Sequence, residues 1–98
     1  MTTGSRISSE GLDARRRRLL FRSWHRGIRE MDIVLGNFAD AQLAGLSDAE
    51  LDEYEAWLEI PDQLMFAYVN GAEATPGDVD TPLFRKLLAF HSKGRTTP

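Results

Sequence analysis

The sequence predicts an all-α protein, a compact bundle of five short helices. Apolar residues recur at spacings of three and four along most of the chain, as they do on one face of a helix. No segment shows the sustained alternation or the richness in β-branched residues that is typical of strands. The 98 residues suffice for one small core. We therefore expect a single domain over residues 12–92, between flexible tails over residues 1–11 and 93–98.

The first predicted helix covers residues 10–24. Its core positions fall in one sector of the helical wheel: Leu12, Leu19 and Leu20. A run of four arginines, residues 15–18, covers the whole wheel, so one of them must lie along apolar surface with its guanidinium in water. Arg16 has that position. Phe21 projects to the opposite side, where it is either exposed or covered by a second element, and Trp24 is expected to fill the core.

The second predicted helix covers residues 27–42, after a break at Gly27. Four apolar residues at helical spacing form its core face: Ile28, Met31, Leu35 and Phe38. Arg26 and Glu30 fall nearly opposite this face, so we expect both side chains to point outward. Arg29 and Ile33 lie around them on the same outward surface.

Arg26 is poorly explained by local helix stability. A cation is unfavourable at the positive end of the helix dipole, and Arg four residues before Glu is the weaker order of that ion pair. One interpretation is a solvated surface charge, since exposed ion pairs contribute only about 0–1 kcal/mol. The adjacent Gly27 and an exposed Ile33 favour the other interpretation, a patch that binds a partner.

The third predicted helix begins at a capping box formed by Ser47 and Glu50. Leu51, Tyr54 and Leu58 mark its buried stripe, with Trp57 adjacent. Its other side carries four carboxylates, those of Asp52, Glu53, Glu55 and Glu59. Because no histidine or base accompanies these carboxylates, we expect a solvated acidic face and not an acid–base site.

The fourth predicted helix covers residues 61–69. Pro61 suits its first position, and Asp62 suits the positive end of its dipole. The segment is apolar most of the way round, so we expect it to be central. The fifth helix is predicted to begin at Thr81-Pro82. Its core face carries Leu83, Phe84, Leu87, Leu88 and His91.

Charge is divided unevenly along the chain. Residues 1–29 hold eight arginines and two acids, residues 30–84 hold thirteen acids and no Lys or Arg, and residues 85–98 hold four bases. Either the folded protein has a basic and an acidic side that orient a partner, or the two halves neutralise each other within the bundle.

Several functional classes are excluded or disfavoured. The absence of cysteine excludes disulfides, thiolate catalysis and Cys-containing metal sites. No Gly-rich phosphate loop is present, and the two histidines, His25 and His91, are far apart in sequence, so we expect neither an enzyme nor a cofactor or metal of its own. No apolar run approaches the roughly 18 residues of a membrane span, so we expect no membrane insertion.

The N-terminal segment has no apolar stretch like that of a secretory signal. A mitochondrial presequence is longer and poorer in acids than a segment containing Glu10 and Asp13, so we expect a bacterial cytoplasmic protein.

The segment Arg26-Gly27-Ile28-Arg29-Glu30 resembles the Arg-Gly-x-x-Glu signature of the succinate dehydrogenase flavinylation factor family. These are small five-helix proteins that help to attach FAD to the flavoprotein subunit. The resemblance runs from about residue 15 to residue 90. It includes Met31-Asp32-Ile33, Leu46-Ser47-Asp48, Trp57-Leu58 and Asp62.

The resemblance implies a protein that binds the flavoprotein subunit of succinate dehydrogenase or fumarate reductase and holds it so that a partner histidine can attack the ring methyl of FAD. The FAD would be carried by the partner. This protein would act as a monomer that positions the reacting groups of the partner. The family motif implies partner contacts by Arg26, Gly27 and Glu30. The outward surface adds Arg29, Ile33 and His25, and Asp62 is a further member.

Two alternatives stay open. The same outward patch would serve a generic interaction adaptor of another complex. The arginines of the first helix, with Trp24 or His25 stacked on a base, would also suit a nucleic acid. The acidic balance of the protein, with a sequence pI of about 5.3, disfavours the nucleic acid.

Overall fold

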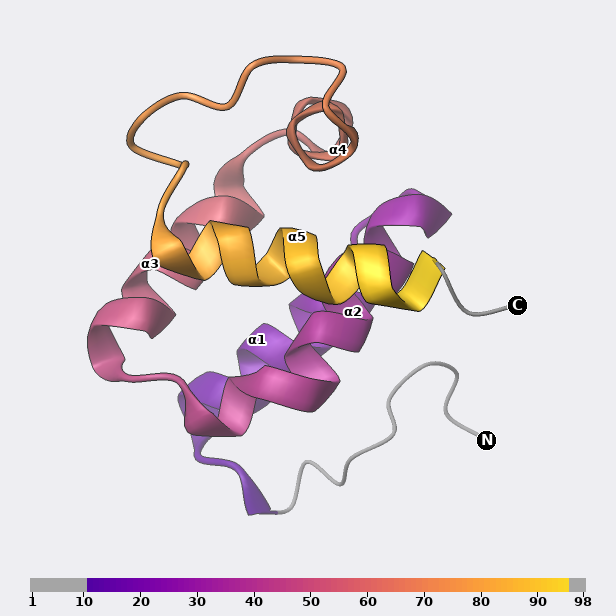
Figure 1. The fold of residues 1–98 in the computed structure, drawn as a ribbon. Helices are drawn as coiled ribbons and strands as arrows, with labels where there is room; N and C mark the ends of the chain where they lie inside the picture. Colours follow the sequence, from indigo (N-terminus) through magenta and orange to yellow (C-terminus); the bar gives the residue numbers. More distant parts are fainter. Residues whose placement is uncertain (1–10, 96–98) are drawn as a thin grey trace.

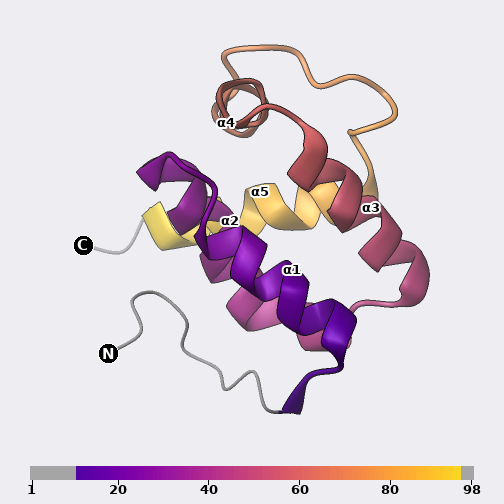
Figure 2. The ribbon, with the colours of Figure 1, turned by 180° about the vertical axis from the view of Figure 1, so that it is seen from behind.

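The structure, a computed structural model, describes residues 11–95, and its helices match the predicted all-α class. The described residues form α1 (Ala14–Trp24), α2 (Arg29–Gln42), the 3-10 turn η2 (Leu43–Gly45), α3 (Asp48–Glu59), α4 (Asp62–Asn70) and α5 (Pro82–Arg95) (Figure 1). α2 is the central helix and contacts α1, α4 and α5. α5 crosses one side of α2 in Figure 1, and α1 lies on the other side, which faces the viewer in Figure 2.

The first two helices begin later than predicted. α1 starts at Ala14 because the Asp13 carboxylate accepts a hydrogen bond from the Arg16 amide and caps the helix. α2 starts at Arg29 because Gly27 has a φ of +113° and Ile28 is extended. Residues 26–28 are therefore a turn and not the first residues of α2.

The core contains the predicted face of α2 and the aromatic residues of α3. Met31, Leu35 and Phe38 are fully buried, as expected. The rings of Tyr54 and Trp57 lie around Phe38, with ring centroids 6.3 and 6.2 Å from it. Burying side chains of this size stabilises the fold by roughly 1.5–3 kcal/mol each, so these residues supply much of the favourable free energy.

α1 packs closely on α2 through Trp24. A Cβ added to Gly36 would lie 2.3 Å from the Trp24 ring, so only glycine admits the indole at this point. Trp24 is half-buried, and its Nε1 donates to Asp40 Oδ1 at 3.3 Å. The predicted core position of Trp24 is thus correct in part, because the side chain packs against the core but is only partly buried.

Two buried hydroxyls join α1 to α2 and α3. Ser23 Oγ donates to the Leu19 carbonyl and lies 2.5 Å from the Tyr54 hydroxyl, which also reaches the Leu35 carbonyl at 3.3 Å. Burial raises the pKa of Tyr54 well above its ordinary value, so the phenol stays neutral. These bonds satisfy polar groups that would otherwise destabilise the core.

The acidic face of α3 is largely exposed to solvent, as predicted, and three of its carboxylates also pair with arginines of α1. Arg15 lies 2.7 Å from Asp52 and 2.9 Å from Glu55, and Arg22 lies 2.7 Å from Glu59. The basic and acidic halves of the sequence therefore neutralise each other at the contact between α1 and α3. The predicted capping box at the start of α3 is confirmed.

Arg16 was expected to extend its guanidinium into water, and this was wrong. Its Nε donates to the Leu43 carbonyl at 2.9 Å, and its Nη2 donates to the Leu46 carbonyl. These carbonyls follow the end of α2, where the Leu43 carbonyl also accepts from the Leu46 amide at 3.3 Å. Arg16 therefore anchors α1 to the connection between α2 and α3.

α4 was predicted to be central, but it lies at the edge of the bundle (Figure 1). Only Met65 and Val69 of this helix are buried, and Leu64 is 39% exposed. Pro61 caps the helix instead of starting it. A nine-residue helix that touches α2 on one side leaves its other apolar residues partly in solvent.

α5 begins where predicted, and the Thr81 hydroxyl accepts from the Phe84 amide at 3.1 Å. The helix continues to Arg95, beyond residue 92, where we placed the end of the domain. Most of the predicted flexible tails lies outside the described residues. Among the described helices, none has the length and apolar character needed to cross a membrane.

Candidate functional site

The turn between α1 and α2 contains the Arg-Gly pair of the motif. Gly27 has a left-handed φ of +113°, which residues with a Cβ rarely adopt. Asp32, one turn into α2, accepts a hydrogen bond from the Arg26 amide at 2.6 Å. The glycine and this bond together fix how the chain enters α2. Asp32 was not among the predicted site residues.

Arg26 does not point outward, which corrects the prediction made from the helical wheel. Its guanidinium lies 2.8 Å from Asp62, and its Nε donates to the same carboxylate oxygen at 2.9 Å. The two side chains are only 11% and 17% exposed. The wheel failed because Arg26 precedes the turn and is not on α2. We call this pair the Arg26–Asp62 clamp.

The Arg26–Asp62 clamp joins two connections that are far apart in sequence. Arg26 follows α1, whereas Asp62 is the first residue of α4. Arg26 Nη2 also donates to the Ile60 carbonyl at 3.4 Å. A Cβ on Gly27 would lie 3.9 Å from Asp62 Oδ2, so the glycine borders the same carboxylate. Arg26, Gly27 and Asp62 therefore form one structural unit that holds the start of α2 against α4.

Glu30 and Ile33 are exposed, as predicted, and they border a hollow. Ile33 is 42% exposed, and no hydrogen bond or ion pair joins Glu30 to another described side chain. The hollow, of about 420 Å³, lies between α2, α4 and α5 and is lined by Glu30, Ile33, Val34, Phe66, Asn70 and His91. We call it the α2–α4–α5 hollow. A carboxylate stands at its rim and apolar side chains form much of its wall.

Sequence reasoning missed Phe66, Asn70 and His91 as members of this hollow. Each comes from a helix other than α2, and of the three only His91 had been placed on a predicted core face. His91 lies on the predicted face of α5, but the α2–α4–α5 hollow exists only because the end of α5 meets the start of α2. No residue pattern within a single helix indicates which other helix it will contact.

The remaining predicted residues, Arg29 and His25, are both exposed. Arg29 is the first residue of α2, next to Glu30. His25 is directed back along α1, because its Nδ1 donates to the Phe21 carbonyl at 2.7 Å. Its ring stacks on that of Phe21, with centroids 4.0 Å apart. The predicted set therefore divides into the clamp with Gly27, the hollow with the neighbouring Arg29, and His25, which stacks on Phe21.

The arrangement suits binding. Within residues 11–95, no group of three or more His, Asp or Glu side chains is placed to hold a metal ion. The α2–α4–α5 hollow offers a carboxylate that can accept hydrogen bonds from a cation, and apolar surface for a neighbouring side chain. The turn beside it is fixed by glycine and the clamp, so these groups are presented in one geometry.

Comparisons with known proteins identify the family. Residues 17–91 match the family described as flavinator of succinate dehydrogenase. This match covers the turn, the clamp and the α2–α4–α5 hollow. No solved structure matches the chain significantly.

Individual relatives agree with this match. The chain is 36% identical over 87 residues to the FAD assembly factor SdhE of Acetobacter pasteurianus, which covers 89% of this chain and 80% of the relative. It is also 36% identical over 96 residues to the mitochondrial succinate dehydrogenase assembly factor 2 of Caenorhabditis briggsae, which covers 95% of this chain and 79% of that protein. The chain therefore belongs to the family of flavinators of succinate dehydrogenase.

Proposed function

We propose that this protein binds the flavoprotein subunit of succinate dehydrogenase, or of fumarate reductase, through the α2–α4–α5 hollow and the start of α2. The chain is an assembly factor for the flavinylation of succinate dehydrogenase, by its family and its relatives. The observation that carries the choice of surface is Glu30. This carboxylate is exposed beside Ile33, while most neighbouring charges are paired within the bundle.

The FAD belongs to the partner in this proposal. A flavin dinucleotide carries a negative pyrophosphate, and the α2–α4–α5 hollow presents the Glu30 carboxylate at its rim, which repels phosphate. The described residues also lack a glycine-rich loop leading into a helix, the usual cradle for such a group. The donor set of the hollow therefore does not fit FAD as a cofactor of this chain.

The contribution of this protein is then positioning. A rigid surface that holds two parts of the flavoprotein in a fixed relation favours a reaction between groups that the partner itself carries. The turn at Gly27 and the Arg26–Asp62 clamp give the start of α2 that rigidity. We therefore expect no catalytic residue in this chain, and no enzymatic activity without the partner.

The side chains of the α2–α4–α5 hollow indicate which residue types of the flavoprotein would bind there. Glu30 would accept hydrogen bonds from an Arg or Lys of the partner. An aliphatic or aromatic side chain next to that cation would enter the hollow and cover Ile33 and Phe66. Arg29, exposed next to Glu30, would reach a carboxylate on the same partner surface.

We further propose that the protein is a monomer of the bacterial cytoplasm. One matched relative is bacterial and several are mitochondrial, so the family occurs in both settings. The match to the FAD assembly factor SdhE of Acetobacter pasteurianus supports the bacterial assignment.

The test replaces Glu30 by Gln, which keeps the shape and removes the charge. We expect covalent flavin fluorescence on the denatured flavoprotein band to fall about tenfold, equivalent to roughly 1.4 kcal/mol of lost interaction. The melting temperature should stay unchanged, because Glu30 has no partner within the described fold. Glu73→Gln, the same change in an exposed loop, is the matched control.

Unchanged flavinylation by Glu30→Gln would contradict the proposed surface. Recovery of another protein in place of the flavoprotein, in co-purification with the wild-type chain, would favour the generic adaptor instead.

A further inference from the structure

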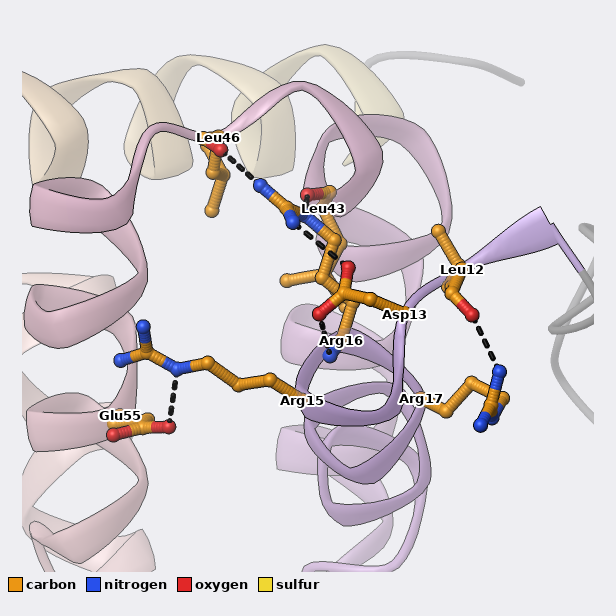
Figure 3. Close-up of polar contacts among 8 residues, drawn as sticks. All are labelled: Leu12, Asp13, Arg15, Arg16, Arg17, Leu43, Leu46 and Glu55. Atoms are coloured by element: carbon orange, nitrogen blue, oxygen red, sulfur yellow. Dashed lines mark hydrogen bonds and ion pairs between the residues drawn. The ribbon is translucent and has the colours of Figure 1, made fainter.

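The four consecutive arginines of α1 have separate roles. Figure 3 shows Arg15 extending to Glu55 of α3, Arg16 reaching the carbonyls of Leu43 and Leu46, and Arg17 lying on a different side of the helix. Arg15 and Arg16 therefore fasten α1 to the bundle. These contacts do not involve the other two arginines of the run, Arg17 and Arg18.

Arg17 and Arg18 are both exposed on the outer side of α1. Arg17 donates to the Leu12 carbonyl at 2.5 Å, a contact within its own segment. Arg18 has no hydrogen bond or ion pair to any residue that the structure describes. Neither guanidinium contributes to contacts between helices, so helix packing does not account for them.

The next turns of the same face carry exposed aromatic surface. Phe21 is 63% exposed, the highest fraction among the large apolar residues described. It follows Arg17 and Arg18 by four and three residues, and His25 follows it by four, so all lie on one face. The stack of Phe21 on His25 holds both rings in place before any partner arrives.

A shallow hollow of about 480 Å³ lies over this face. It is lined by Ala14, Arg17, Arg18, Phe21 and Arg22. Figure 2 shows α1 on the viewer's side of α2, with no described helix in front of it. We call this surface the outer face of α1.

We propose that the outer face of α1 is a second docking surface, which binds an acidic segment of the flavoprotein partner. Carboxylates of that segment would pair with Arg17 and Arg18, whose planar guanidinium groups suit bidentate contacts. An aromatic or aliphatic side chain next to them would pack on Phe21. The inference rests on the proposed function and extends it to a different face.

The position of His25 supports one continuous interface. It stacks on Phe21 at one end and directly precedes the Arg26–Asp62 clamp at the other. A partner bound to the start of α2 therefore needs to extend only past the turn to reach the outer face of α1. Two contact areas on either side of a rigid turn would fix the orientation of the partner better than one.

Two other classes of partner fit less well. A long nucleic acid would meet the carboxylates of Asp52 and Glu59, which are 75% and 74% exposed next to α1. A membrane surface needs a broad apolar face, whereas Phe21 is the single large apolar residue of the outer face of α1. A short acidic segment would contact Arg17 and Arg18 and need not extend to these carboxylates.

The experiment measures the Kd of the purified flavoprotein subunit for immobilised wild-type protein, Arg18→Glu and Phe21→Ala. We expect Arg18→Glu to weaken binding at least tenfold and to reduce the dependence of Kd on salt. Phe21→Ala should weaken binding about fivefold with little change in salt dependence. Lys86→Glu, the reversal of an exposed base on α5, should stay within twofold of the wild type.

The outcomes separate this inference from the proposed function. Absence of flavoprotein binding by the wild type would overturn both. Weakened binding by Glu30→Gln together with wild-type affinity of Arg18→Glu and Phe21→Ala would overturn the second surface alone.

Binding of the wild type to single-stranded DNA or to vesicles containing phosphatidylglycerol tests the other classes. Loss of either activity in Arg18→Glu, with unchanged affinity for the flavoprotein, would also overturn the inference. Melting temperatures of both variants within about 2 °C of the wild type would show that lost affinity is not lost folding.

Discussion

The contact between α1 and α3 and the start of α2 are both rich in charged residues, but they use charge differently. At the first, Arg15 and Arg22 pair with carboxylates of α3. At the second, Arg29 and Glu30 are exposed beside Ile33. Paired charges hold helices together, whereas unpaired charges next to exposed apolar surface are available to another protein.

The comparison shows that charge density alone does not indicate function. The densest basic segment, residues 15–18, divides between internal anchors and exposed side chains. Arg26 belongs to the family signature and is nonetheless an internal anchor. Its effect on partner binding would act through the turn that it holds, and Glu30 would make the direct contact.

The largest stability effect is expected when the Arg26–Asp62 clamp is broken. Arg26→Ala leaves the Asp62 carboxylate mostly buried without its partner, which should cost about 1–3 kcal/mol. The measurement is the free energy of unfolding in urea. Glu30→Gln, four residues away, is the control and should change it by less than about 0.5 kcal/mol.

A double variant sharpens this test. If Arg26 and Asp62 act as a pair, replacing both by Ala should cost less than the sum of the two single changes. Additive costs would show that the clamp does not couple the two connections, and our distinction between anchoring and exposed charges would then fail at this position.

A smaller effect is expected for Arg16→Met, which keeps much of the apolar stem and removes the guanidinium. The Leu46 carbonyl would lose its Arg16 donor, and the Leu43 carbonyl would keep only the Leu46 amide, which together should cost about 1 kcal/mol in urea unfolding. Arg18→Met removes the same group from the outer face of α1 and should leave stability unchanged. Equal costs for the two variants would contradict the separate roles assigned to these arginines.

The smallest effect concerns pH. The hydrogen bond from Arg15 lowers the pKa of Glu55 below its ordinary value of 4.5. A carboxyl whose pKa is lower in the folded state stabilises the fold above the pKa of the unfolded state, and this contribution is lost as pH falls through the folded pKa. Arg15→Gln should therefore melt slightly lower at neutral pH.

The same variant should show a shallower decline of Tm between about pH 5 and pH 3, because the Glu55 contribution is already missing. Thermal melts followed by circular dichroism measure this slope. Lys86→Gln removes an exposed base on α5 and should retain the wild-type slope. A wild-type slope in Arg15→Gln would show that the ion pair contributes nothing to folding.

Features that depend on one helix were predictable from the sequence. The face of Met31, Leu35 and Phe38 follows from spacing alone, since burial of one side of a helix imposes its period. The capping box of Ser47 and Glu50 was also recognisable, because its two hydrogen bonds join residues three apart. The exposure of Glu30 and Ile33 followed from the same periodicity.

Features that join different helices were not predictable. Arg26 and Asp62 are 36 residues apart, and an ion pair between two connections leaves no periodic pattern. The sequence did not indicate the exposed position of α4, because the apolar composition of this helix resembles that of a central helix. The α2–α4–α5 hollow draws Phe66 and His91 from two further helices, so it exists only in the folded chain.

The two tryptophans give this protein a built-in pair of optical reporters. Trp57 is 2% exposed in the core, and its emission should change only when the bundle unfolds. Trp24, half-buried against Gly36, lies within two residues of the turn that presents the proposed interface. In the wild-type protein a spectral change without unfolding therefore reports on docking at that turn, and Trp24→Phe leaves a chain whose intrinsic fluorescence follows folding alone.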